Sequence, residues 1–257
     1  EVQAWPTTLD FGAGRLGEEL ITTTVLRNDG SLPVRVTSET TSEQGRAQGP
    51  KVGDSIHLAP GEIRQVEARW TPPIPGRAKA ALLWRDDDGQ VLLNQPVVIH
   101  GLAPRVDIAE EFPMGTVWVG GTQKMNLSLH NRGDAELQVQ GLELIDAVGN
   151  VVSAGQVVSG LGFTARTAST TLNPGEETVI SVTLAPARRA QYATTLQVLT
   201  DDPLHPRRDI HLRGVGGGAT LTITEIDLGT LPVGQRRSQE LSLTNTGDLD
   251  LRIHSIL

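Results

Sequence analysis

The sequence contains no cysteine, and this absence removes several kinds of chemistry at once. Disulfide bonds, thiolate zinc sites and cysteine nucleophiles all need that side chain. The compartment stays open, because a protein without cysteine is stable in oxidising and in reducing surroundings.

Aromatic residues and long apolar runs are also scarce. Phe, Trp and Tyr make up 3% of the 257 residues, so we expect cores built from leucine, valine, isoleucine and alanine. No run approaches the roughly 18 apolar residues of a membrane span, and no signal-like apolar segment follows Glu1. We therefore predict no membrane span.

Positive charge is in the minority, since the net charge is −8. Proteins that bind nucleic acid through its phosphates usually carry a basic stripe. Here the arginine pairs are isolated among acidic residues, at 188–189, 207–208 and 236–237. We interpret these pairs as solvated surface and predict no nucleic-acid partner.

One pattern of asparagine and glycine occurs three times. An Asn-x-Gly motif follows an alternating segment at 28–30, 131–133 and 245–247. Each asparagine is preceded by a glycine 16 positions earlier and by another 11 positions earlier. A Pro-Gly-Glu motif recurs at 60–62 and 174–176, each 71 positions before the next Asn-x-Gly asparagine. Fixed spacings of this kind are the signature of internal repeats.

The spacings divide the chain into three predicted units, 1–103, 104–217 and 218–257. The second unit has 11 extra residues between its two motifs, which we place in a long loop near 140–172, most of it the Gly/Ser-rich segment 153–170. The third unit stops before its Pro-Gly-Glu motif. By the repeat arithmetic it lacks roughly 60 residues, and we expect it to be the incomplete N-terminal part of a repeat in a longer chain.

Alternation of apolar and polar residues predicts the fold of each unit. Ile63, Val66, Ala68 and Trp70 recur near a period of two, which is typical of a strand with one buried face. Segments 77–101 and 192–214 each read as a hairpin. About seven short strands in ~100 residues favour an all-β fold of tandem immunoglobulin-like antiparallel β-sandwich repeats.

The recurring residues have structural interpretations. We expect Asn28, Asn131 and Asn245 to form turns, with positive φ tolerated by asparagine and glycine. The four tryptophans are expected in packing positions rather than as a platform for sugars.

The order of these motifs resembles a known family. The segments on which the resemblance rests are "LDFGAGRLG", "IDLGTLPVG", "LRNDG", "LTNTGDLDL", "LNPGEETVISV" and "LTDDPLHPRRDIHLRG". Together they resemble ASH (abnormal spindle, hydin) domains and bacterial choice-of-anchor D repeats, relatives of the major sperm protein sandwich. The resemblance implies extracellular or envelope modules in bacteria, or scaffold modules of cilia and centrosomes in eukaryotes. The second unit departs with "FPMGTVWVGG", and the first has "WRDDDGQ" where "TDDPLHP" is expected.

Signs of catalysis are few. The six histidines lie in none of the motifs typical of metalloproteases, serine hydrolases or phosphate-binding loops. His100 and His211 fall near equivalent places and are interpreted as repeat features. Asp86, Asp87 and Asp88 could offer oxygen ligands to calcium, with Asp201 and Asp202 at the matching place, but carboxylates also favour exposed turns. We predict no catalytic, cofactor or metal site, and leave calcium at Asp86–Asp88 open.

The function that follows is non-catalytic. We expect a structural and interaction protein whose sandwich repeats act as a spacer or scaffold in a bacterial surface, envelope or secreted assembly. The alternative is an adhesion module that binds carbohydrate or peptide through the 140–172 loop or an open sheet edge. The partners expected are proteins, with self-assembly through the incomplete third repeat as one option. An extracellular, cell-surface or periplasmic location is favoured, and a cytoplasmic scaffold stays open.

Overall fold

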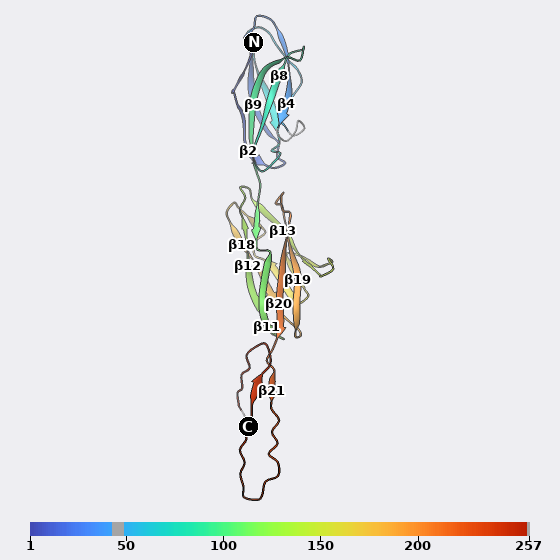
Figure 1. Ribbon diagram of the computed structural model, residues 1–257. Coiled ribbons are helices and arrows are strands. Elements are labelled where there is room, and N and C mark those ends of the chain that lie inside the picture. Colours follow the sequence, from blue (N-terminus) through green and yellow to red (C-terminus); the bar gives the residue numbers. More distant parts are fainter. Residues whose placement is uncertain (43–48, 256–257) are drawn as a thin grey trace. The chain divides into compact units, whose positions relative to one another are not determined.

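The computed structural model describes residues 1–42 and 49–255 (Figure 1). Residues 43–48 of the first predicted repeat and 256–257 of the third lie outside the described residues. Strands and turns make up the described chain, which contains no helix long and apolar enough to cross a membrane. The chain divides into two compact units, one of residues 1–104 with 133–136, the other of 105–132 with 137–257.

The first unit is a sandwich of two sheets. One sheet has four strands in the order β1-β3-β7-β5, and the other has five in the order β2-β9-β8-β4-β6. All neighbours are antiparallel except β2 and β9, which run parallel. The strands are β1 (Val2–Trp5), β2 (Leu9–Arg15), β3 (Leu20–Asn28), β4 (Val34–Ser42), β5 (Lys51–Val52), β6 (Ile56–Leu58), β7 (Ile63–Trp70), β8 (Gly76–Arg85) and β9 (Val91–Leu102).

The second unit repeats this plan with longer edges. Its sheets are ordered β10-β12-β18-β16-β15 and β11-β20-β19-β13-β14, and β17 also pairs with β13. The strands are β10 (Val106–Ile108), β11 (Glu111–Trp118), β12 (Gln123–Asn131), β13 (Leu137–Ile145), β14 (Val151–Gly155), β15 (Val157–Gly160), β16 (Phe163–Thr167), β17 (Thr171–Leu172), β18 (Glu177–Leu184), β19 (Ala190–Thr200) and β20 (Arg207–Gly217). The all-β, immunoglobulin-like fold class predicted from the sequence is therefore confirmed.

Each unit buries its own core, as the alternating pattern requires. In β7 the inward residues Val66, Ala68 and Trp70 are buried. Ile63, which the pattern also assigned to the buried face, is 63% exposed, because it lies an odd number of residues before Val66 and therefore on the outward face of the strand. The cores are mainly aliphatic, as the composition predicts.

Positive-φ glycines mark equivalent positions. Gly12, Gly115 and Gly229 have φ of 76°, 70° and 62°. In the first two units this glycine lies at a shift of register between the parallel partners, β2 with β9 and β11 with β20. Glycine adopts this backbone without a steric penalty, so a side chain here would strain the bulge.

The predicted long loop of the second unit is wrong as a description of 151–167. This segment forms β14, β15 and β16, which extend both sheets of the sandwich. The adjacent valine pairs of "VVSAGQVVSG" are β-branched and favour strands, although the glycine and serine between them resemble loop composition.

The segment after Gly217 is mostly exposed. It contains one pair of short strands, β21 (Leu221–Ile223) with β22 (Leu243–Asn245). Several of its large apolar side chains face solvent: Leu221, Ile223, Leu228, Leu231, Val233, Leu241 and Ile253. A repeat boundary at 217/218 stays a prediction.

Candidate interaction site

A buried asparagine ties together two turns in each sandwich. Asn131 is fully buried and its Nδ2 donates to Leu172 O (3.0 Å), while its Oδ1 accepts from Arg105 N (3.3 Å). The bond to Leu172 crosses 41 residues of sequence. The Asn-x-Gly motif therefore connects the end of β12 to the segment before the Pro-Gly-Glu turn.

Asn28 makes the same connection in the first unit. Its Nδ2 donates to Leu58 O (3.1 Å) and Leu32 O (2.8 Å), and its Oδ1 accepts from Gly30 N (2.9 Å). The motif does form a turn, but the expected positive φ is wrong, because Asn28 and Gly30 keep negative φ. The side chain, rather than a left-handed backbone, closes the turn.

Asn245 shows how much of this connection is local. It keeps the turn bonds, from Nδ2 to Leu249 O (2.8 Å) and from Gly247 N to Oδ1 (3.0 Å), yet the residue is exposed. The described residues offer Asn245 no partner equivalent to Leu58 or Leu172. The turn thus forms from local sequence, and burial comes from the distant partner.

The Pro-Gly-Glu turns are closed by their glutamates. Asn173 N donates to Glu176 Oε2 (2.8 Å), and this backbone bond lowers the pKa of the Glu176 carboxyl. Ala59 N donates likewise to Glu62 Oε2 (2.7 Å), and that bond, assisted by Arg64, lowers the pKa of Glu62. Both carboxyls favour the charged form, because their donors stabilise it.

These glutamates predict a pH dependence of stability. A carboxyl with a lowered folded pKa stabilises the fold above its unfolded value, near 4.5, and loses this effect as pH falls through the folded pKa. We expect thermal melting of E62Q/E176Q to depend less steeply on pH than that of the parent, between about pH 6 and about pH 3.

Circular dichroism melts over that pH range would measure the effect. Glu225→Gln is the matched control, because Glu225 is exposed and has no partner in the part of the chain that the structure describes. Parallel curves for E62Q/E176Q and the parent would contradict the assignment.

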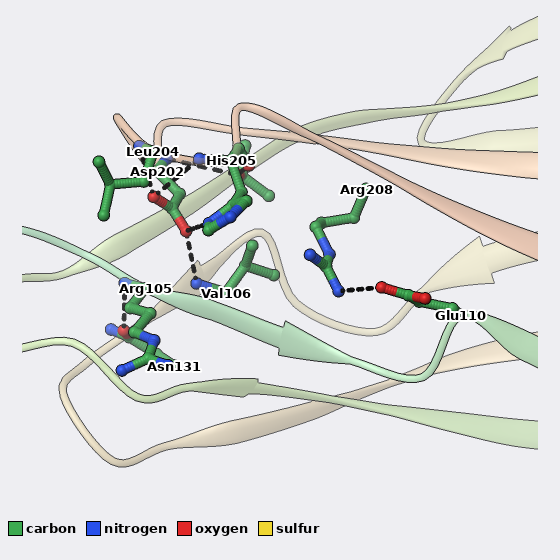
Figure 2. A network of polar contacts seen from close by, with 9 residues as sticks. Arg105, Val106, Glu110, Asn131, Asp202, Leu204, His205 and Arg208 are labelled. Atoms are coloured by element: carbon green, nitrogen blue, oxygen red, sulfur yellow. Dashed lines mark hydrogen bonds and ion pairs between the residues drawn. The ribbon is translucent and has the colours of Figure 1, made fainter.

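The carboxylate of Asp202 is buried and serves the backbone (Figure 2). Its Oδ2 accepts from Val106 N (2.9 Å), and its Oδ1 accepts from Leu204 N (2.9 Å) and His205 N (3.1 Å). His205 Nδ1 lies 3.7 Å from Oδ2. Asp202 thereby fastens the "DDPLHP" turn to strand β10, which begins the unit.

Asp86 has a different environment, although the sequence analysis placed Asp86 and Asp202 at matching positions of the two repeats. Its Oδ1 accepts from Asp88 N (3.1 Å) and Gln90 N (2.8 Å), within its own hairpin loop. The loop of Asp146 has the same bonds, with Val148 N (3.0 Å) and Asn150 N (2.8 Å). Among the residues that the structure describes, no group of three or more His, Asp or Glu is placed to hold a metal ion.

The histidines are dispersed rather than assembled. His100 pairs with Ala13 and His211 with Glu111 in the parallel strands, whereas Thr116, the counterpart of Ala13, lies beside Val215. The predicted equivalence of His100 and His211 is therefore wrong by four residues. Only the register of β9 and β20 with their parallel partners shows which residues are equivalent, because the shared dipeptide "IH" is too short to align the two strands.

The tryptophans divide into two pairs. Trp70 and Trp84 lie in the first core, where Trp70 meets Phe11 edge-on at 5.7 Å between ring centroids. Trp5 and Trp118 are 44% and 49% exposed. The packing interpretation holds for the first pair only.

The edges of the sheets differ between the two units in how far a neighbouring strand covers them. β16 covers the edge of β18 with five residue pairs, from Phe163 with Leu184 to Thr167 with Ile180. In the first unit β5 covers the corresponding edge of β7 with two pairs, Lys51 with Arg69 and Val52 with Ala68. A hollow of about 480 Å³ lies beside β7 where the cover ends. Sequence reasoning named open edges in general but did not locate this one.

Comparison with known protein families gives a match within the second sandwich. Residues 104–215 match the family model described as HYDIN/CFA65/VesB-like, Ig-like domain. This match confirms the resemblance to the ASH and hydin family predicted from the motifs. It covers the second predicted repeat almost from end to end.

Among curated proteins, the sensor histidine kinase RegB of Cereibacter sphaeroides is 27% identical over 120 residues, which is 44% of this chain and 26% of RegB. The chain thus spans about a quarter of the length of the curated relatives it matches.

Solved structures give weak overall superpositions. A protein of unknown function from Porphyromonas gingivalis W83 has a TM-score of 0.36 and 16% identity, over 83% of this chain and 99% of that one. The seventh PapD-like domain of human CEP192, an ASH domain, has a TM-score of 0.32 and 20% identity, over 44% and 86%. The YadV chaperone has a TM-score of 0.31 and 8% identity, over 82% and 98%.

Proposed function

We propose that the protein is a non-catalytic structural and interaction module, and the match of residues 104–215 to the HYDIN/CFA65/VesB-like, Ig-like domain model supports this proposal. Its sandwich repeats serve as a spacer or scaffold that presents strand edges and exposed segments to protein partners. The observation that carries this proposal is the repetition of one unit whose buried asparagine is bound to its own backbone. Buried polar groups whose hydrogen bonds are satisfied in this way specify a unique core, which is a structural role.

The location that we propose is a bacterial surface, envelope or secreted assembly. The resemblance to choice-of-anchor D repeats supports this location, and the scarcity of lysine, which occurs only at Lys51, Lys79 and Lys124, suits a bacterial source. A cytoplasmic scaffold is the competing location. Protease digestion of intact cells that express the chain distinguishes them, because only a surface protein is cleaved without lysis.

Self-assembly through 218–257 is the part of this proposal that can be tested first. Exposed apolar side chains gather there, and such surfaces promote association. We expect the solution mass of the full chain to rise with concentration, measured by light scattering after size exclusion. A chain that ends at Gly217 should stay monomeric.

A paired substitution separates this segment from general surface effects. L221S/I223S removes two half-exposed apolar side chains from β21, and we expect it to abolish association. Leu204→Ser is the control, since Leu204 is 63% exposed in a turn of the second unit. A full chain that is monomeric at every concentration would contradict self-assembly.

Adhesion is the second candidate function. The hairpin arm 148–161, present in the second unit, exposes Val148, Val151, Val152, Val157 and Leu161. Leu161 has φ of 54°, a costly backbone for a leucine, and strained exposed residues cluster at functional sites. Binding to a glycan array that is lost when the arm or the exposed tryptophans are altered would support adhesion.

A further inference from the structure

The second sandwich holds its Leu-x-Pro-Gly-Glu segment, 172–176, through three hydrogen bonds to one asparagine. Asn131 N donates to Glu176 O (2.9 Å), and Gly175 N donates to Asn131 O (2.9 Å). The third bond runs from Asn131 Nδ2 to Leu172 O (3.0 Å). The asparagine therefore contacts the segment at its first, fourth and fifth residues.

The first sandwich repeats these bonds. Asn28 N donates to Glu62 O (3.1 Å), and Gly61 N donates to Asn28 O (2.7 Å). Asn28 Nδ2 donates both to Leu58 O (3.1 Å) and to Leu32 O (2.8 Å). The bond inside the Asn-x-Gly turn and the bond to the distant segment coexist, because the amide nitrogen carries two hydrogens.

The Leu-x-Pro-Gly-Glu segment closes its own turn. In the second unit Glu176 N donates to Asn173 O (3.0 Å), and Asn173 N donates to Glu176 Oε2 (2.8 Å). In the first unit the same two bonds join Glu62 and Ala59, at 3.0 and 2.7 Å. The turn needs no group from the asparagine that receives it, so a separate chain can supply it already formed.

Strand β22 presents the same asparagine on an edge without a neighbour. Its sheet has two strands, β21 and β22. Thr246 N donates to Thr220 O (2.9 Å) on the side of β21. Because backbone groups alternate along a strand, those of Asn245 point to the other side. There, among the described residues, the N–H and C=O of Asn245 have no main-chain partner, and unpaired edges are templates for strand addition.

The apolar side chains of this edge are uncovered as well. In the second unit Leu127 and Leu129 of β12 are 3% and 0% exposed, opposite Ile180 and Thr178 of β18. Counted from the asparagine, Leu241 and Leu243 take their places, and Leu241 is 46% exposed. A strand added beside β22 would cover these leucines and pair the free backbone groups together.

We propose that β22 receives a Leu-x-Pro-Gly-Glu segment of another protein, followed by an alternating strand that pairs antiparallel with β22. The leucine and glutamate carbonyls accept from Asn245 Nδ2 and N, and the glycine N–H donates to Asn245 O. A folded second copy has no such segment to offer, because both of its motifs are bound to Asn28 and Asn131. The inference rests on the proposed interaction role and names the kind of partner.

The first experiment uses two capped peptides from the chain itself. Residues 171–184, "TLNPGEETVISVTL", and 57–70, "HLAPGEIRQVEARW", share only Leu, Pro, Gly and Glu at matching positions. Added to the isotope-labelled full chain, both should shift the amide signals of 243–247 and protect Asn245 N from hydrogen exchange. Methylating the Gly175 nitrogen removes the donor to Asn245 O, and should weaken the first peptide about three- to tenfold.

A substitution in the protein tests the side-chain bond. Asn245→Asp keeps the Oδ1 acceptor of Gly247 N and Thr220 N but loses the Nδ2 donor. It should weaken both peptides about three- to tenfold. Asp250→Asn is the control, because Asp250 is exposed in the same segment and the exchange of side chains is the reverse one. This variant should bind both peptides as the parent does.

Three outcomes would overturn the proposal: no amide shifts at 243–247 with millimolar peptide, equal binding of the methylated and parent peptides, or equal binding by N245D and the parent protein. Protection of Asn245 N that rises with protein concentration in the absence of peptide would make a second copy the occupant instead. Light scattering of the full chain does not depend on peptide binding, so failure of this edge and failure of the proposed function are distinguishable.

Discussion

Replacing Asp202 by alanine is expected to destabilise the second unit by about 3–5 kcal/mol. The substitution leaves the backbone donors of Val106, Leu204 and His205 without their acceptor, and of these three bonds the one from Val106 is buried and the other two are partly buried. The Val106 donor retains its desolvation cost, because its bond to the fully buried Asp202 side chain is itself buried. Urea unfolding followed by circular dichroism measures the loss.

Two further variants separate burial from residue type. Asp202→Asn keeps one acceptor oxygen, so it should restore part of the stability lost in the alanine variant. Asp86→Ala removes an aspartate that bonds Asp88 N and Gln90 N in an exposed hairpin loop, and should cost about 1 kcal/mol or less. Equal losses for D202A and D86A would show that Asp202 does not fasten the turn to β10.

The second large effect is expected at Asn131. Asn131→Ala removes the bonds to Leu172 O and from Arg105 N, and should lower stability by about 2–4 kcal/mol. The loss arises from separating two turns that lie far apart in sequence. Differential scanning calorimetry should show it as a lower melting temperature.

Asn245→Ala is the matched control for this prediction. The same residue type in the same motif bonds Thr220 N, Gly247 N and Leu249 O there, but it is exposed. We expect a loss below about 1 kcal/mol. A loss as large as that of Asn131→Ala would mean that the local turn, and not its buried partner, carries the stability.

Part of the fold could be predicted from the sequence alone. Alternation at Val66, Ala68 and Trp70 identified a strand with one buried face, because strand side chains alternate by geometry. The spacing of Gly12, Gly115 and Gly229 predicted equivalent places, and all three have positive φ. Short-range periodicity and fixed spacing therefore determined the all-β class, the repeats and the family resemblance.

The site needed information that no short pattern contains. Segment 151–167 reads as loop by composition, yet it pairs into strands because β13 and β18 offer it open edges. His100 and His211 appeared equivalent until the register of β9 and β20 separated them.

Three features of this protein were thus decided by tertiary structure: the burial of Asp202, the reach of Asn131 to Leu172, and the short cover over the edge of β7. Each depends on which distant segment arrives beside a given strand. The sequence determined the strands and their inward faces, since these follow from neighbouring residues. Only the fold decided which polar groups were enclosed and which edge stayed open, since pairing partners lie tens of residues away.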